Sequence, residues 1–313
     1  MAVLSSAQLG WLPDAELRHQ LIKYSLAPAL QVDNAIHASH RSVRRDEGIE
    51  FSRFRPFQPG DDLRRVDWRV FGRTDRLLVR ESESEGRLTV VLVVDLSASM
   101  GMADSRDVTR YDYVARLVGA LAWLAAEHHH DVMLIGLQTP TPIVLPTGAG
   151  RAQLERVIRR LDEWRPSGGG VRIEAISEAL SHAPARSAVF AFSDYLGDDC
   201  GLQVAVARTA ARGMSLTSTQ VLLPQELSPP PRGQFRVVDC ESGSTRWFDA
   251  GLEGREYRKR LNRLLREIRE DQVRSGARFV SIATDIGLAE SCHAMLAQSI
   301  TGRQRVLATC ELS

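Results

Sequence analysis

Lysine and cysteine are both scarce in this chain of 313 residues. The only lysines are Lys23 and Lys259, so nearly all of the 40 basic residues are arginines. The four cysteines, at positions 200, 240, 292 and 310, stand far apart and form no CxxC pair. This spacing argues against a zinc ribbon and against a disulfide-stapled secreted fold. Reduced thiols and a cytoplasmic location are therefore expected.

Long apolar runs are also missing. The most apolar helical stretch, YVARLVGALAWLAAEHHH from Tyr113, is interrupted by Arg116 and offers only about ten uninterrupted apolar residues, whereas a membrane span needs about 20. The N-terminus has no basic segment followed by a long apolar one, so no secretory signal is predicted. The formal charge of +1 creates no overall attraction for nucleic acid or anionic membranes. We expect a soluble globular protein without a membrane span.

Apolar strand-like runs alternate with helical segments from residue 87 onward. Strands are predicted at 87–97, 131–138, 142–147, 187–194, 214–223 and 277–285. Helices are predicted at 109–128, 150–164, 173–183, 199–212 and 252–274, and a hairpin-like pair at 234–240 and 244–249. This order predicts a doubly wound, Rossmann-type α/β fold, with a mostly parallel central sheet flanked by helices.

The segment before this domain has a different composition. Residues 1–86 are rich in arginine and poor in long periodic elements, apart from a helix predicted near residues 14–35. The sequence therefore predicts an N-terminal segment at 1–86 that packs on the main domain, a main domain at 87–303 and a C-terminal tail at 304–313.

Small oxygen-bearing side chains follow the first long strand at every second position. In VVDLSASM these are Asp95, Ser97 and Ser99. A second apolar strand, FAFSD, closes on Asp194. Ligands of doubly wound sheets bind beyond the carboxyl ends of the strands. We therefore expect the two strand-end acids and the two serines to meet at that edge.

A hard divalent cation suits this set of oxygen atoms. Magnesium takes near-octahedral oxygen ligands and retains several of its waters. Ser97 and Ser99 are predicted to ligate Mg²⁺ or Mn²⁺ directly, while Asp95 and Asp194 hold coordinated waters, which leaves one position for an incoming carboxylate. The simpler interpretation is that Asp and Ser after a strand only cap the next helix.

An enzymatic alternative uses the same carboxylates. Strand-end acids with a magnesium ion also suit phosphoryl transfer, which makes a magnesium-dependent phosphohydrolase the alternative function. Phosphatases of this layout carry a second Asp two residues after the first, and Ser97 occupies that place. No P-loop, GxSxG, HExxH or GxGxxG motif occurs.

Two resemblances to known families follow from these motifs. The DxSxS sequence, the SGGG loop and the later SD resemble the metal-ion-dependent adhesion site of von Willebrand factor type A domains. Residues 51–85 resemble the bacterial domain-of-unknown-function 58 family, whose signature is PGDD, an arginine and then DW. In this chain the signature falls on Pro59, Gly60, Asp61, Asp62, Arg65, Asp67 and Trp68.

The second resemblance implies a partner and no enzymatic activity. Proteins of that family are encoded beside MoxR-type AAA+ ATPases and are thought to act with them as adaptors in the assembly or activation of other proteins. The expected partners are thus such an ATPase and its client. The resemblance covers residues from about 35 to 300.

The sequence departs from the family at one expected metal ligand. A threonine usually follows the glycines of the loop, but SGGGVR places Val171 there. A methyl group thus replaces a hydroxyl, which puts the affinity for the ion in doubt. Ser167, at the start of the same loop, is the residue that would compensate.

Two other segments give weaker signals. EHHHD, at 127–131, ends a predicted helix, where histidines favour the negative end of the helix dipole without needing a metal ion. RPFQPGDDLRRVDWR mixes aromatic residues with arginines, but its acids alternate with them. Internal ion pairs explain that segment better than a nucleic-acid groove, so no nucleic-acid binding is predicted.

Overall fold

The chain divides into two compact units, residues 35–87 and the remainder. The computed structural model describes residues 8, 10–24, 26, 53–56, 72, 78–81, 88–138, 140–169, 178–185, 187–196, 209, 212–228, 232–274 and 276–297. In the smaller unit, β1 (Arg53–Pro56) pairs antiparallel with β2 (Leu78–Glu81). Outside the described residues lie the motif residues Pro59, Gly60, Asp61, Asp62, Arg65, Asp67 and Trp68.

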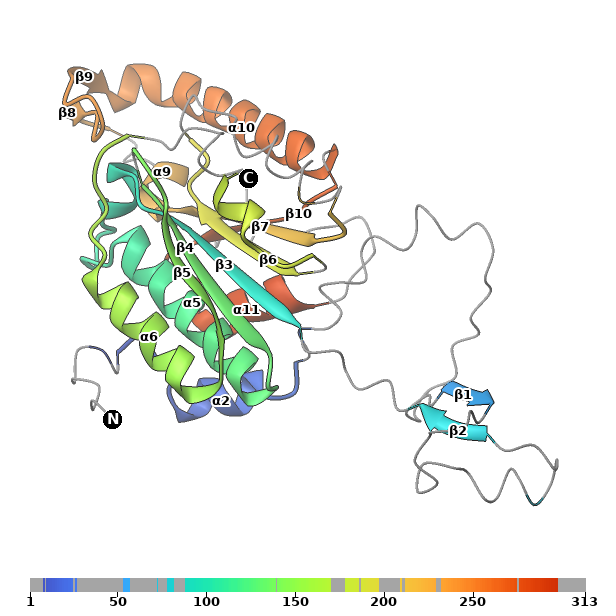
Figure 1. The fold of residues 1–313 in the computed structure, drawn as a ribbon. Helices are drawn as coiled ribbons and strands as arrows, with labels where there is room; N and C mark the ends of the chain where they lie inside the picture. The colour runs from blue at the N-terminus through green and yellow to red at the C-terminus, as the bar shows by residue number, and fades with distance from the viewer. Residues whose placement is uncertain are drawn as a thin grey trace. The chain divides into compact units, whose positions relative to one another are not determined.

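A six-stranded sheet forms the centre of the larger unit (Figure 1). Its order is β10–β7–β6–β3–β4–β5. The strands, in chain order from β3 to β7 and then β10, are Thr89–Asp95, Asp131–Leu137, Ile143–Ala149, Ala188–Ser193, Ser215–Leu222 and Arg278–Ala283. All neighbouring pairs are parallel except β4 and β5. The predicted doubly wound, mostly parallel sheet is confirmed: numbered in chain order, its strands follow the 3-2-1-4-5-6 order of such folds, with β5 as an antiparallel edge strand.

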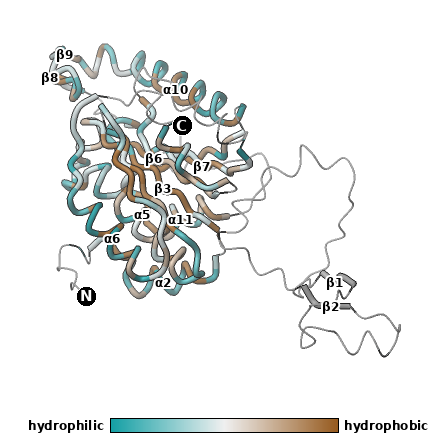
Figure 2. The backbone as a smooth tube through the Cα atoms, in the orientation of Figure 1, coloured by the Kyte–Doolittle hydropathy of each residue, from teal (hydrophilic) through white to brown (hydrophobic). Residues whose placement is uncertain are grey.

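Side chains of β3 alternate between two apolar layers. Val90, Leu92 and Val94 join the core beneath helices α5 (Arg110–Glu127), α6 (Gly150–Glu163) and α11 (Leu288–Leu296). Val91 and Val93 belong to a second cluster on the opposite face. A strand covered on both faces must be apolar at every position, which explains the uninterrupted run TVVLVV. In Figure 2 the hydrophobic colour is concentrated along these central strands.

Helix α10 (Ala250–Arg274) covers part of the second face. The carboxamide of Gln272 accepts a hydrogen bond from the Ser218 hydroxyl of β7, at 3.0 Å. Before α10, a short helix α9 (Pro224–Leu227) is followed by the hairpin of β8 (Gln234–Val238) and β9 (Thr245–Asp249). The predicted hairpin is therefore observed. The predicted helix at 199–212 lies almost wholly outside the described residues, as do residues 170–177.

The predicted N-terminal helix is shorter than expected. Helix α2 spans Ala15–Leu21, whereas the sequence predicted a helix near 14–35. Asp14 caps its first turn, and a turn follows in which the Tyr24 N–H donates to the Leu21 carbonyl. Leu17 and Leu21 belong to the core cluster that contains α5 and α11. This helix, from within the predicted segment 1–86, thus packs in the larger unit. No described helix has the length and apolarity that crossing a bilayer requires.

Candidate functional site

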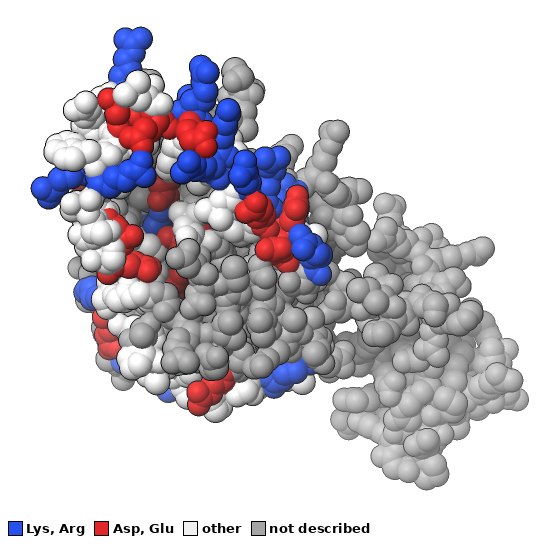
Figure 3. All heavy atoms as spheres, turned by 90° about the horizontal axis from the view of Figure 1, so that it is seen from above, with Lys and Arg blue, Asp and Glu red and all other residues white. Residues whose placement is uncertain are grey.

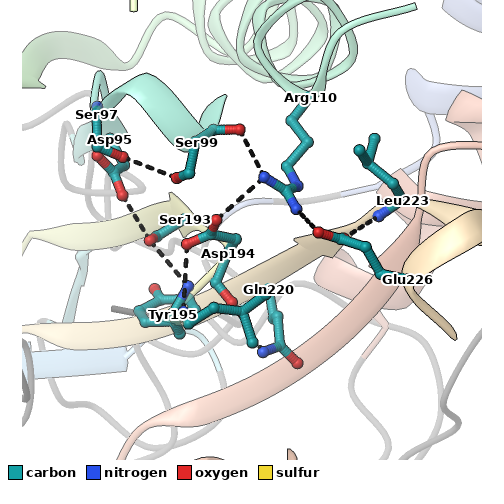
Figure 4. A network of polar contacts seen from close by, with 11 residues as sticks. Asp95, Ser97, Ser99, Arg110, Ser193, Asp194, Tyr195, Gln220, Leu223 and Glu226 are labelled. Carbon is teal, nitrogen blue, oxygen red and sulfur yellow. Dashed lines mark hydrogen bonds and ion pairs between the residues drawn. The ribbon is translucent and has the colours of Figure 1, made fainter. Parts of the chain in front are cut away.

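The end of β3 arranges three of the predicted site residues. One oxygen of Asp95 accepts a hydrogen bond from the Ser97 N–H at 2.8 Å, which closes a tight turn after the strand. A short 3-10 helix, η3 (Ala98–Gly101), follows and turns Ser99 back toward Ser97. Their hydroxyl groups are hydrogen-bonded to each other, with the two oxygens 3.0 Å apart (Figure 4). The two-residue spacing of the serines therefore places their hydroxyls next to each other.

The neighbouring strand β6 contributes the second acid. Val94 of β3 pairs with Phe192 of β6, so both strands end at the same edge of the sheet. Ser193 donates its hydroxyl hydrogen to the other oxygen of Asp95, at 2.7 Å, and Asp194 follows directly. The structure thus brings Asp95, Ser97, Ser99 and Asp194 together, as the strand-end pattern predicted.

Backbone hydrogen bonds join the glycine-rich loop to this turn. The Ser167 N–H donates to the Leu96 carbonyl at 2.8 Å, and the Gly168 carbonyl accepts from the Ala98 N–H at 2.9 Å. The Ser167 hydroxyl accepts a hydrogen bond from the Gln138 carboxamide at 3.1 Å. Ser167 therefore helps to hold the loop that contains Ser97. Val171 lies outside the described residues.

A buried arginine completes the site, and the sequence analysis missed it. Arg110 is the first residue of α5 and is only 2% exposed. One terminal nitrogen, Nη1, donates to the Ser99 carbonyl at 2.5 Å and to Asp194 Oδ2 at 3.1 Å. The other, Nη2, donates to Glu226 of α9. A cation at the positive end of a helix dipole needs compensating anions, so the arginine in TRYDYV was the available signal.

Glu226 extends the polar network away from the strand ends. Its second carboxylate oxygen accepts from the Leu223 N–H at 2.8 Å, and its backbone carbonyl accepts from the Tyr257 hydroxyl of α10 at 3.1 Å. The network thus runs from Ser99 and Asp194 through Arg110 to Glu226 of α9 (Figure 4), and the Tyr257 hydroxyl extends it to α10. It joins residues of η3, α5, the end of β6, α9 and α10.

The electrostatic environment of Asp95 favours a positive ion. Burial raises the pKa of Asp95 above its usual range, hydrogen bonds from Ser193 and Ser97 oppose that shift, and the negative charge of Asp194 adds to it. Arg110 pairs with Asp194, whereas Asp95 accepts its hydrogen bonds from uncharged donors. Of the two carboxylates, Asp95 is therefore the one whose negative charge is less compensated by neighbouring groups.

The geometry of the hydroxyl pair fits a divalent cation. Adjacent ligands of an octahedral magnesium ion, each about 2.1 Å from it, lie about 3.0 Å from each other. The oxygens of Ser97 and Ser99 have this separation. Within the described part of the chain, no three His, Cys, Asp or Glu side chains gather in a way that would hold a metal ion. An ion at this edge would thus depend on the serines as well as on Asp95 and Asp194.

Comparison with known proteins identifies the family. The family described as "Protein of unknown function DUF58" matches residues 53–271, more than half of the chain. The chain belongs to this family. Uncharacterized proteins of Mycobacterium bovis and Mycobacterium tuberculosis are each 26% identical to it over 242 residues, which are 76% of this chain and 75% of theirs. The match to the DUF58 family confirms the resemblance inferred from the PGDD and DW motif.

Solved structures similar to this DUF58 protein include two from Bacteroides. BatB from Bacteroides thetaiotaomicron is 17% identical, with a TM-score of 0.45, and the match covers 67% of this chain and 96% of BatB. An aerotolerance-related membrane protein from Bacteroides fragilis is 16% identical, with a TM-score of 0.46, and the match covers 66% and 96% of the two chains.

Proposed function

We propose that this DUF58 protein is a non-enzymatic adaptor that binds a partner protein through a divalent cation, Mg²⁺ or Mn²⁺. The observation that supports this most directly is the 3.0 Å separation of the Ser97 and Ser99 hydroxyls, beside two strand-end carboxylates. A cation bound there supplies residual positive charge and an exchangeable coordination position. A carboxylate of the partner suits that position.

Each residue of the site has a distinct role in this proposal. Ser97 and Ser99 bind the ion directly, and Asp95 and Asp194 supply negative charge around it. Ser193 holds Asp95 in place through its hydroxyl, and Arg110 holds Asp194. Both carboxylates are thus oriented by this chain before a partner arrives.

Thermal unfolding tests the ion itself. A ligand at about a hundredfold excess over its Kd stabilises the folded state by about 2.7 kcal/mol. Millimolar magnesium or manganese should raise the Tm of the wild type relative to EDTA, and Ser97→Ala should reduce that rise. Ser181→Ala, an exposed serine away from the site, is the matched control and should keep it. Identical Tm values with metal and with EDTA would contradict the ion site.

The proposed partner is a MoxR-type AAA+ ATPase, together with a client protein that the two assemble or activate. Pull-down of the purified ATPase with this chain as bait should succeed in magnesium and fail in EDTA. Ser99→Ala should weaken the interaction, and Ser181→Ala should leave it unchanged. If the ATPase is recovered equally in EDTA and with Ser99→Ala, the ion has no part in the interaction.

The phosphohydrolase alternative finds no specific support in the geometry. Both oxygens of Asp95 accept hydrogen bonds, from the Ser97 N–H and the Ser193 hydroxyl. These hydrogen bonds position the carboxylate and suit an ion-binding role and a nucleophilic role equally. Steady release of phosphate from a small phosphoester by the purified wild type, lost in Asp95→Asn, would favour the hydrolase over the adaptor.

A further inference from the structure

The β8–β9 hairpin exposes apolar side chains that a strand usually buries. All five residues of β8 are exposed, and three of them are apolar: Phe235, Val237 and Val238. Trp247 of β9 is 69% exposed. A strand in a soluble protein normally hides one face against a core. In the antiparallel register, Val238 and Trp247 lie on the same face of the hairpin, and neighbouring exposed apolar side chains indicate an interaction surface.

The hairpin is nevertheless held firmly on α10. Phe248 packs edge-to-face on Tyr257 with ring centroids 5.9 Å apart, and Arg246 pairs with Glu253. Because neighbouring residues of a strand point to opposite faces, Trp247 points away from the face that carries Phe248. Arg236 lies directly across from Trp247 in the antiparallel register. The outward face is therefore ordered before anything binds.

One edge of this small sheet is open. In the part of the chain that the structure describes, β8 pairs only with β9. The backbone N–H and carbonyl groups on its other side are available for an added strand. Extended peptides are commonly recognised in this way, with affinity from the backbone and specificity from alternate side chains.

Helix α10, next to the hairpin, carries eight basic and five acidic side chains. Exposed cations along α10, for which the described residues provide no acidic partner, are Arg255, Arg258, Lys259 and Arg263. Figure 3, which looks down on this side, shows Lys and Arg side chains with Asp and Glu side chains between them. Arg236 adds a positive charge on the hairpin. The complementary partner is acidic.

The same charges disfavour a second copy of this chain as the occupant. In a symmetric antiparallel pairing of two β8 strands about their midpoint, each Arg236 would face the other. Like charges directly opposite each other destabilise a strand pair.

The hairpin reaches the edge of the sheet where the candidate ion site lies. A β-carbon on Gly169 would stand 3.7 Å from the Glu241 carboxylate in the hairpin turn. Gly169 follows Gly168, whose carbonyl accepts the hydrogen bond from Ala98 beside Ser97. A partner that approaches the ion site therefore meets the hairpin as well.

We infer that the hairpin and the exposed face of α10 form a docking surface for an acidic, extended protein segment that carries apolar side chains. The segment pairs with the free edge of β8, packs its apolar side chains on Trp247 and Val238, and places its acids against Arg236 and the cations of α10. This inference deepens the proposed function. It rests on that function only for the idea that the same partner binds both the ion site and the docking surface.

The test uses the full chain and a fluorescein-labelled 12-residue peptide that repeats Glu-Glu-Val-Val, so that each face of the extended peptide carries both acidic and apolar side chains. Two matched peptides replace every Glu by Lys or every Val by Ser. Binding is measured by fluorescence anisotropy in EDTA, so that the result does not depend on the ion site. The Glu/Val peptide should bind, more weakly as salt is raised, and the two matched peptides should bind at least tenfold more weakly.

Substitutions then locate the binding. Trp247→Ala and Arg236→Glu, both at exposed positions, should each weaken the Glu/Val peptide at least tenfold. Arg151→Glu on α6, whose side chain is 81% exposed, is the matched control and should change little. Circular dichroism confirms that the variants are folded. No binding, equal binding of the three peptides, or unchanged binding by Trp247→Ala would each overturn the inference.

Two further measurements distinguish other occupants. Co-sedimentation with phosphatidylglycerol vesicles that is lost in Trp247→Ala would assign the surface to a lipid membrane instead. A concentration-dependent dimer that dissociates in Trp247→Ala would assign it to a second copy of the chain. Either result overturns the inference without affecting the magnesium-dependent rise in Tm, which tests the ion site alone.

Discussion

Helices α5 and α10 both carry arginines, but these arginines have opposite surroundings. Fourteen of the 18 residues of α5 are buried, so Arg110 enters the interior only with two carboxylates to receive it. Four of the 25 residues of α10 are buried, so its arginines remain in water. Burial therefore decides whether an arginine builds a site or a charged surface.

The energetic consequences of the two settings also differ. An exposed ion pair such as Arg260 with Glu256 is worth about 0.3–0.5 kcal/mol, because solvent screens it. A buried pair is different, because removing one partner leaves an uncompensated charge in the interior. The Arg110 network is thus a place where a single substitution has a large effect.

The largest expected effect is that of Arg110→Met. The substitution preserves volume but leaves Asp194 and Glu226 without their cation, so the free energy of unfolding should fall by about 3–5 kcal/mol. Urea denaturation measures it. Arg258→Met on the exposed side of α10 is the matched control and should change stability by less than about 0.5 kcal/mol. A loss below about 1 kcal/mol in Arg110→Met would show that the network is not a buried ion pair in solution.

A second pair of substitutions compares the apolar sides of the two helices. Leu117 of α5 is fully buried, and Leu117→Ala should cost about 2–5 kcal/mol through lost burial and a cavity. Leu252 of α10 is 83% exposed, and Leu252→Ala should cost less than about 0.5 kcal/mol. Similar costs for the two substitutions, by urea denaturation, would mean that α10 is covered in the free protein.

A pH experiment extends the comparison to the loop that precedes α5. Burial opposes ionisation of Asp104, but hydrogen bonds from Arg106, Thr284 and the Val108 N–H outweigh it and lower its pKa to about 2. A lowered carboxylate pKa stabilises the fold above the unfolded value near 4, and this contribution is lost as the pH falls toward 2.

The measurement is the free energy of unfolding between about pH 5 and 2. Asp104→Asn should be less stable than the wild type at pH 5, and its stability should fall less steeply as the pH is lowered. Glu270→Gln on the exposed part of α10 is the control and should follow the wild type. Parallel pH profiles for Asp104→Asn and wild type would contradict the lowered pKa.

The smallest predicted effect concerns the start of α5. Thr109 accepts a hydrogen bond from the Asp112 N–H at 2.9 Å, and Asp112 accepts one from the Thr109 N–H in return. Thr109→Ala should reduce the free energy of unfolding by about 1 kcal/mol, as caps usually do. Thr109→Ser keeps the hydroxyl and should recover most of the loss in urea denaturation. Equal losses for Ala and Ser would show that the methyl group, rather than the cap, matters there.

Local sequence patterns were enough to place most elements of the larger unit. The continuous apolar run before Asp95 predicted a buried strand, and the apolar helical run from Thr109 predicted α5. The helix predicted near 14–35 was too long, because a helical pattern alone does not show where the chain turns after Leu21. Boundaries depend on such local turns, which propensity resolves poorly.

The candidate site was only partly visible in the sequence. Its hydroxyls and acids could be predicted because they follow local patterns. Asp95, Ser97 and Ser99 stand at every second position after one strand, and Asp194 closes a second strand. Arg110 could not be assigned, because it lies 84 residues from Asp194 and 116 from Glu226 along the chain. No local pattern specifies a pairing across such distances.

The sequence by itself determined the order of strands and helices, the family, and the residues of the DxSxS motif. These depend on apolar periodicity and short-range spacing, which the chain carries locally. Only the tertiary structure decided that β6 lies beside β3, that Arg110 enters the site, and that the apolar strand QFRVV remains exposed. Which strands are adjacent and which side chains are buried depends on how distant segments pack. The same type of residue is buried or exposed according to what covers it.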